Sequence, residues 1–510
     1  MNKLFLLIAV ISLLFCVACG TSSGSGSTGF GGGGTSGSFT NASLKGNYAY
    51  EIVGSDLTSG LPFREVGAFV ADGSGNVSSG EDDFAEGSSV VSNIVTATTT
   101  GQAYSVSSNG TALLTISFSN GGGIQLGLSV VSSPTVYLAV SAIAPLGTVL
   151  QANGTGFLVP QTTTAFAAPT GTFVFRMQDV VATTALGTTQ VTPSAKVGTF
   201  TAAAGVLSAG TEDENNAGVV SQVALSSGLF SAPDALGRGT GSFTDSNAVT
   251  SPFYYYLVDG NHLHLFSSLQ GTIGLGRAVA QSASPSLSGS YVFGSRGDDS
   301  FSLGGVNTVG QFTASNGSIT AGGPFDLVQD GGTPVSGAFT SGTYAPTAGL
   351  AGRFVVNLTP STGSAIQEIY WVVSPSLAFF ITDDPTKVEA GTATAQSGSF
   401  SSNSAVNGTF AFAMDGFNTI GSGALYDRVG NLHWDGAGNL GLTEFLNVSG
   451  SVTTSGTLMG TYTLASTGRA VGNINSLSSN LVFYLASSGQ GYILQADPSV
   501  EIDGNMGTTP

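Results

Sequence analysis

The sequence is short of charge, and of basic residues in particular, which excludes several classes of function. Charged residues make up 8% of the chain, and 12 Lys and Arg stand against 30 Asp and Glu, giving a formal net charge of −18. Binding to nucleic acid, like electrostatic attachment to an anionic membrane, requires clustered basic residues. We therefore expect no nucleic-acid partner and a surface made of Ser, Thr, Gly and Asn.

Cysteine is also scarce, and both cysteines lie near the N-terminus beside a long apolar run. Lys3 precedes the run, which covers residues 4–17, and Cys16 and Cys19 lie at its end. These are the proportions of a secretory signal peptide, and the run is too short for a transmembrane helix. Cleavage at this point leaves no pair of thiols, so we expect a mature protein without a disulfide.

The end of this segment resembles the N-terminus of bacterial lipoproteins, in which a small residue precedes a cysteine that is lipidated. Ala18 and Cys19 match that pattern, whereas Cys16 stands where the family usually has Leu. The resemblance implies that residues 1–19 are a lipoprotein signal peptide and that acyl chains such as palmitate on Cys19 anchor the chain in a membrane. It also implies that Gly20 permits export to the outer membrane or cell surface. The alternative is an ordinary signal peptide and a fully secreted protein.

Residues 20–43 are dominated by Gly and Ser and cannot bury enough apolar surface to become ordered. We expect a disordered linker between the anchor and the first domain.

The rest of the chain repeats one phrase, Gly-x-aromatic-x-aromatic, four times. The copies begin at Gly46, Gly171, Gly289 and Gly408, so the chain contains four copies of one domain of roughly 115 residues. A Gly-x-Phe-x-Ala-type hairpin follows, and each of the first three copies closes on a Gly-rich segment that ends in Gln. The spacing predicts β repeats over residues 44–161, 169–281, 287–397 and 406–510. The fourth copy reaches the end of the chain, so we expect its last strand to be short or missing.

Alternating side chains predict an all-β fold. In the first copy Tyr48, Tyr50 and Ile52 alternate with small or polar residues, which is typical of a half-buried strand with its other face in water. Glycine is too frequent for stable helices. We expect four tandem antiparallel domains, each an eight-stranded up-and-down barrel, with β-sandwiches as the alternative. The first copy offers these apolar runs: 47–53, 65–71, 76–84, 90–98, 101–107, 110–118, 124–131 and 135–141, with 154–160 as an extra closing strand.

Two acidic clusters are the main candidates for a metal site. They lie at equivalent positions in the first two copies, where the third and fourth copies offer only Asp326 and Glu444. Clustered carboxylates can hold calcium, which takes six to eight oxygen ligands, but a solvated strand end is the simpler interpretation and we expect no bound metal or cofactor. The candidate residues are Glu81, Asp82, Asp83, Glu212, Asp213 and Glu214.

Catalytic patterns are weak. The chain has three histidines, of which His262 and His264 share one strand face without a third metal ligand at matching spacing. No nucleophile-elbow pattern supports a Ser-His-Asp site. We therefore expect a protein that is not an enzyme.

The repeats resemble the Gly/Ser/Thr-rich tandem-domain lipoproteins of environmental Gram-negative bacteria, whose units look like small meander barrels of the lipocalin or avidin kind. The opening phrase and the hairpin carry this resemblance. It implies a lipid-anchored surface protein of the cell envelope that displays tandem barrels for binding or adhesion, or as an envelope component, with a cell-surface or polysaccharide partner. A carrier of small apolar ligands inside the barrels is the alternative, and a secreted hydrolase is a third hypothesis.

Overall fold

The computed structural model describes residues 39–96, 102–131, 135–144, 152–185, 188–300, 304–418, 424–475 and 479–507. Cys19, the predicted signal peptide and most of the predicted linker lie outside these residues. Residues Ser36–Pro510 form one compact unit. Within the described residues every helix is a short 3-10 turn, at Asn41–Ser43, Thr163–Ala165 and Asn403–Ala405, and none is long and apolar enough to cross a membrane.

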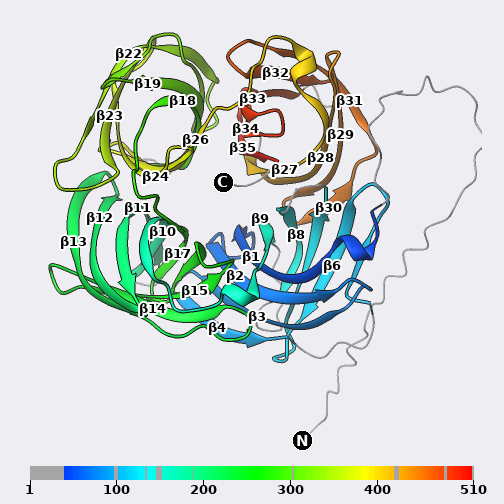
Figure 1. Ribbon diagram of the computed structural model, residues 1–510. Helices are drawn as coiled ribbons and strands as arrows, with labels where there is room; N and C mark the ends of the chain where they lie inside the picture. The colour runs from blue at the N-terminus through cyan, green and yellow to red at the C-terminus, as the bar shows by residue number, and fades with distance from the viewer. Residues whose placement is uncertain are drawn as a thin grey trace, which may run out of the picture. The chain divides into compact units, whose positions relative to one another are not determined.

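Antiparallel strands build four eight-stranded barrels in succession, which confirms the predicted fold class (Figure 1). The barrels are numbered 1 to 4 in chain order. Barrel 2 closes without interruption, so that each strand pairs with the next and β17 pairs with β10. Its strands are β10 (Gly171–Ala185), β11 (Thr188–Ala203), β12 (Val206–Asn216), β13 (Val219–Phe230), β14 (Arg238–Asp245), β15 (Thr250–Leu257), β16 (His262–Ser267) and β17 (Thr272–Ala280).

Barrel 1 follows the same path with its fourth strand in two parts. β3 pairs with β4 and β5 pairs with β6, while a bridge from Thr96 to Phe118 joins the two sides. The runs predicted as two strands, 90–98 and 101–107, are therefore halves of one barrel strand, and the segment at 154–160 is the regular eighth. The strands are β1 (Lys45–Asp56), β2 (Pro62–Asp72), β3 (Val77–Glu86), β4 (Ser89–Val95), β5 (Tyr104–Val106), β6 (Thr111–Ser117), β7 (Gly123–Ser129), β8 (Val136–Ala144) and β9 (Ala152–Pro160).

Barrel 3 has its third strand in two parts, β20 and β21, which both pair with β19 and β22. β18 pairs with β19 and with β26, which closes the barrel. The strands are β18 (Gly289–Asp299), β19 (Gly305–Ser315), β20 (Ser318–Ile319), β21 (Pro324–Gln329), β22 (Val335–Pro346), β23 (Arg353–Pro360), β24 (Ile366–Ser374), β25 (Leu377–Thr382) and β26 (Lys387–Ala395).

Barrel 4 is complete: its last strand is present, and at seven residues it is shorter than the nine-residue last strands of the other barrels, as expected from the end of the repeat. β35 pairs with both β34 and β27 and closes the sheet before the chain ends. Its fourth strand is in two parts, β30 and β31, which both pair with β29. The strands are β27 (Asn407–Asn418), β28 (Ala424–Asp435), β29 (Asn439–Val448), β30 (Ser451–Thr454), β31 (Leu458–Leu464), β32 (Arg469–Ile474), β33 (Ser479–Ser487), β34 (Gln490–Gln495) and β35 (Val500–Met506).

Aromatic side chains fill the barrel interiors. In barrel 2, Phe200 stacks on Phe173 with ring centroids 5.2 Å apart and contacts Phe230 and Phe243 at the same distance. Each barrel has an interior cluster of this kind. These packed interiors oppose the hypothesis that the barrels carry small apolar ligands inside.

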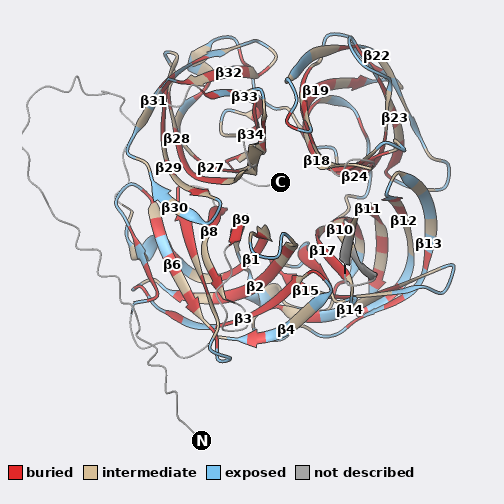
Figure 2. Cartoon of the chain, turned by 180° about the vertical axis from the view of Figure 1, so that it is seen from behind, coloured by how far each residue is buried: buried red, intermediate tan, exposed pale blue. Residues whose placement is uncertain are grey.

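The outer faces of the first strands do not meet water, and this overturns the expectation from their small or polar residues. Ala49, Val174, Val292 and Ala411 alternate with the interior aromatics, yet each is 0% exposed. Each belongs to a second set of apolar clusters, which lie between barrels 1 and 2, 2 and 3, 3 and 4, and 4 and 1. The barrels therefore contact one another in cyclic order, whereas strands such as β13 are largely exposed (Figure 2).

Candidate functional site

A cavity lies where the four barrels meet, and it is lined by the first and last strands of every barrel. The strand registers place four residues at one equivalent position on the first strands: Glu51, Arg176, Gly294 and Ala413. Their partners on the last strands are Phe157, Arg277, Thr392 and Asn505. All eight residues line the cavity, so the same outward face of each barrel builds this site with different side chains.

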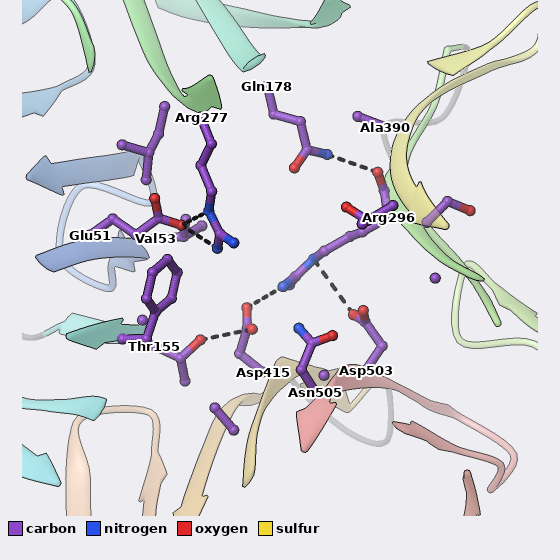
Figure 3. A pocket seen from close by; sticks show the side chains of 18 of the residues that line it. Glu51, Val53, Thr155, Gln178, Arg277, Arg296, Ala390, Asp415, Asp503 and Asn505 are labelled. Carbon is purple, nitrogen blue, oxygen red and sulfur yellow. Dashed lines mark hydrogen bonds and ion pairs between the residues drawn. The ribbon is translucent and has the colours of Figure 1, made fainter. Parts of the chain in front are cut away.

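The position two residues further along each first strand also faces the cavity. It holds Val53, Gln178, Arg296 and Asp415. Gln178 of barrel 2 donates a hydrogen bond of 2.8 Å to the carbonyl oxygen of Arg296 in barrel 3 (Figure 3). Contacts across the cavity therefore join different side chains that occupy one equivalent position of the repeat.

The cavity has two connected lobes. The first lobe has a volume of about 190 Å³ and the second about 360 Å³, and they share Val53, Arg64, Gln178, Arg296 and Asp415. Four of the eight arginines of the chain line the first lobe, namely Arg64, Arg176, Arg277 and Arg296. In a chain with so few basic residues, this concentration makes the cavity the strongest candidate site.

Two of these arginines are neutralised by carboxylates of another barrel. Arg277 of barrel 2 donates a hydrogen bond of 2.7 Å to Glu51 of barrel 1. The Arg277 guanidinium also lies 4.1 Å from the centroid of the Phe157 ring. Glu51 also contacts His264 Nδ1 at 2.7 Å. Burial alone raises the pKa of Glu51, but the Arg277 charge and the His264 contact outweigh it and lower that pKa to about 2.

Arg296 of barrel 3 faces two carboxylates of barrel 4. Its Nη1 atom lies 2.5 Å from Asp415, and its Nε atom lies 3.7 Å from Asp503. Burial raises the pKa of Asp503 to about 7 despite the Arg296 charge. Asp415 also accepts a hydrogen bond of 2.8 Å from Thr155 of barrel 1, so that three barrels meet at this point (Figure 3).

The acidic clusters predicted as metal candidates lie elsewhere, at the contacts between successive barrels. Asp82 and Asp83 are 0% exposed, which overturns the interpretation of a solvated strand end. Asp83 accepts two hydrogen bonds from Arg238 of barrel 2, at 2.7 and 2.8 Å, and a third from Tyr256 at 2.7 Å. Glu81 is 7% exposed on the neighbouring position of β3, where burial raises its pKa to about 8.

The second cluster forms the same contact between barrels 2 and 3. Asp213 is 1% exposed and accepts hydrogen bonds from Arg353, at 2.8 and 2.9 Å, and from Trp371 Nε1 at 2.7 Å. Glu214 lies 3.8 Å from Lys196, and burial raises the pKa of Glu212 to about 7. In the described part of the chain no group of three or more His, Cys, Asp or Glu side chains could hold a metal ion.

A third copy of this contact joins barrels 3 and 4. Asp326, which the sequence places at the same point of the repeat, accepts hydrogen bonds from Arg469 at 2.7 and 2.8 Å and from Tyr484 at 2.7 Å. We call each of these groups an Asp-Arg-aromatic clamp. The arginine of each clamp follows a glycine in the sequence, and this recurring Gly-Arg pair is the signal that could have revealed the clamps.

The closing glutamine of each repeat supplies a second recurring contact. Gln161, Gln281 and Gln396 each donate their amide to two backbone carbonyls of the next barrel. The clamps and these glutamines fix each barrel against its successor, and the cavity walls thereby gain a defined geometry.

The histidines do not form a shared site. His264 is 2% exposed and contacts Glu51, whereas His262 lies on the surface, with its Nδ1 atom 2.9 Å from Asp259. His433 contacts Thr409 in barrel 4. Of the residues that the structure describes, neither a His nor a Cys lines either lobe of the cavity.

Comparison with known proteins gives distant structural likenesses alone. No protein-family model and no curated protein matches the chain. It is similar to isotype 1 transferrin binding protein B of serogroup B Neisseria meningitidis, with 9% identity, 73% of this chain and 83% of that chain covered, and a TM-score of 0.19. It is also similar to a Tyr-167-Ala and Trp-176-Ala double mutant of transferrin binding protein B from Haemophilus parasuis Hp5. The identity is 10%, 74% of this chain and 83% of that chain are covered, and the TM-score is 0.18. At TM-scores this low the likeness carries no argument about function.

Proposed function

We propose that this chain is a non-enzymatic binding protein of the cell envelope, held at the outer membrane or cell surface by a lipid on Cys19. Its ligand site is the cavity between the four barrels. The observation that carries this proposal is the contrast between two sets of positions. The clamp residues recur at three of the four barrel contacts, whereas the equivalent positions at the cavity differ in charge, size and polarity.

This contrast is what a binding scaffold requires. Repeated contacts hold the walls of a site in place, and rigid walls reduce the entropy lost when a ligand binds. Diverse side chains within the cavity supply specificity. The absence of His and Cys among the lining residues leaves arginines, carboxylates, amides and hydroxyls, which suit recognition of a polar ligand.

The anchor follows from the sequence. Ala18 and Cys19 match the lipoprotein pattern, and the Gly/Ser composition of the segment after them suits a tether. Several acyl chains on one cysteine give firm attachment to a membrane. Display for adhesion to a surface polysaccharide is compatible with the same anchor.

The proposal is tested by isolating the protein from its native cells. The wild-type chain should fractionate with membranes, carry the mass of acyl chains on Cys19, and show an additional non-covalent mass in native mass spectrometry. Cys19→Ala should move the protein out of the membrane fraction and leave the non-covalent mass unchanged. A wild-type chain that is soluble, or one that carries no ligand and retains nothing from envelope extracts, contradicts the proposal.

A further inference from the structure

The cavity contains positive charge that the protein itself does not neutralise. Two arginine pairs line its first lobe. Arg176 and Arg277 are direct cross-strand partners on β10 and β17, and the charge of Arg296 lowers the pKa of Arg64. In each pair one member has a carboxylate partner, since Arg277 binds Glu51 and Arg296 binds Asp415.

The other member of each pair has no such partner. Arg64 donates a hydrogen bond of 2.9 Å to the carbonyl oxygen of Phe63, and Arg176 donates one of 3.1 Å to the hydroxyl of Thr392. Neither forms an ion pair with any carboxylate of the described residues. Burial and the neighbouring arginine lower the pKa of each to about 10, so that both stay charged at neutral pH.

A neutral donor completes the set. Tyr137 lines the same lobe and is 2% exposed, yet its hydroxyl has no hydrogen-bond partner. Burial raises the pKa of Tyr137, so the hydroxyl keeps its proton and remains a donor. A buried donor without an acceptor costs free energy, and an oxygen-bearing ligand in the cavity would supply that acceptor.

The carboxylates of the first lobe do not outweigh the arginines. The first lobe has three carboxylates, Glu51, Asp415 and Asp503, and four arginines. The raised pKa of Asp503 reduces its negative charge at neutral pH. The second lobe is lined by Asp298, Asp427 and Glu501 together with Arg64 and Arg296, and burial raises the pKa of each of these three carboxyls. The excess of arginines over ionised carboxylates favours an anion in the first lobe.

We propose that the first lobe binds a small oxyanionic ligand, a phosphate or carboxylate compound, with Arg64 and Arg176 as its countercharges and Tyr137 as an additional donor. Guanidinium groups recognise both kinds of group through paired N–H donors. The volume of about 190 Å³ limits the ligand in this lobe to a molecule not much larger than benzene, which fits a cavity of about 150 Å³. The inference rests on the proposed function because it assigns a ligand class to the same site.

The test measures binding of inorganic phosphate and of malonate by calorimetry at constant ionic strength. One or both should bind the wild-type chain, and the Arg64→Gln/Arg176→Gln double variant should bind at least about tenfold more weakly, since a hydrogen bond to a charged group contributes about 1.5–3 kcal/mol. Lys45→Gln, which removes an exposed cation at the start of β1, should bind like the wild type. The stronger of the two ligands identifies the oxyanion class.

Thermal unfolding without ligand separates a binding role from a structural one. Because burial and a neighbouring arginine together outweigh the carboxylates that attract Arg64 and Arg176, the double variant should unfold at the same temperature as the wild type or at a higher one. A wild-type chain that binds neither anion, or a double variant that binds both equally well, overturns the inference. A neutral or cationic ligand found on protein from native cells overturns it as well, while leaving the proposed function standing.

Discussion

At the scale of single residues, one position of the repeat shows how a barrel interior accepts charge. The strand registers make Glu65, Lys196, Thr308 and Arg428 equivalent. Lys196 lies 3.1 Å from Asp179, and Arg428 lies 2.9 Å from Glu444, so barrels 2 and 4 place an ion pair there. Barrel 1 places Glu65 diagonally across from another acid, Asp82, which is paired with Gly67 and whose equivalent in barrel 4 is Glu444.

The acid pair of barrel 1 has to hold protons. Both residues are 0% exposed, and neither carboxylate oxygen of Glu65 has a hydrogen-bond donor. Burial and the neighbouring carboxylate raise the pKa of Glu65 well above its usual range, and burial raises that of Asp82 to about 8. Two ionised carboxylates side by side in a protein interior are too costly to coexist.

This pair makes stability depend on pH in a defined direction. The folded chain holds protons that the unfolded chain releases above about pH 4, so the contribution is full at low pH and is lost as pH rises toward 8. In the wild type the free energy of unfolding should fall as the pH rises from about 5 to 8. Glu65→Gln should make this fall less steep, by up to about 1.4 kcal/mol per pH unit. Urea unfolding at a series of pH values measures this.

Glu65→Lys, which copies barrel 2, is the matched comparison. It should pair with Asp82 and make barrel 1 more stable toward neutral pH. A Glu65→Gln profile as steep as that of the wild type would show that the pair does not titrate in this range.

At the scale of elements, the clamps connect a third strand of one barrel to a fifth strand of the next. Asp213 on β12 and Arg353 on β23 form the middle clamp, and their side chains are 1% and 10% exposed. The aromatic member of each clamp is paired across strands with the arginine, as Trp371 is with Arg353. Three strands thus meet around one buried carboxylate.

Removing that carboxylate leaves a buried guanidinium without a countercharge. Asp213→Asn should lower the free energy of unfolding by about 3–5 kcal/mol, because breaking one side of a buried pair costs more than replacing both sides. Asp213→Asn/Arg353→Met should recover most of the loss. Urea unfolding and limited proteolysis at the contact between barrels 2 and 3 report both effects.

The exposed pair of Asp259 and His262 provides the control for this experiment. Asp259→Asn should change the free energy of unfolding by no more than about 0.5 kcal/mol. Equal effects of Asp213→Asn and Asp259→Asn would show that the clamp is not important for the barrel contact.

At the scale of the whole Ser36–Pro510 unit, the contact between barrels 4 and 1 differs from the other three. The registers place Phe445 where the clamps have Asp, Thr111 where they have Arg, and Ser129 where they have the aromatic residue. The Phe445 ring lies so close to Gly127 that a Cβ atom on residue 127 would be 2.9 Å from it. Ser129 donates a hydrogen bond of 2.9 Å to the carbonyl oxygen of Gly430. Packing replaces the ion pair at the contact that closes the cycle.

This difference predicts a selective opening of the cycle. Phe445→Asp should place a carboxylate opposite Thr111 without a cation, separate barrel 4 from barrel 1, and increase the radius of gyration in small-angle scattering. Phe445→Asp/Thr111→Arg rebuilds the charge pair of the other contacts and should restore the wild-type radius. An unchanged radius for Phe445→Asp alone would contradict the assigned role of Phe445.

The sequence by itself determined the individual barrels. The alternation of Tyr48, Tyr50 and Ile52 with smaller residues reflects local strand geometry, since neighbouring residues of a strand point to opposite faces. The phrase Gly-x-aromatic-x-aromatic repeats this pattern in all four copies. The equivalence of Asp83, Asp213 and Asp326 was also visible in the spacing. The split fourth strand of barrel 1 was misjudged, because a break in a strand looks like a turn in the sequence.

Only the tertiary structure decided what the outer faces do. The arginine of each clamp lies 140 to 155 residues from its aspartate, and nothing in the local pattern of either strand specifies that distance. Ala49 and Val174 are small enough for an exposed face, yet close approach of the barrels buries them. The cavity with its unneutralised arginines exists because four barrels meet in a cycle, and burial of charge is a property of that assembly rather than of any one repeat.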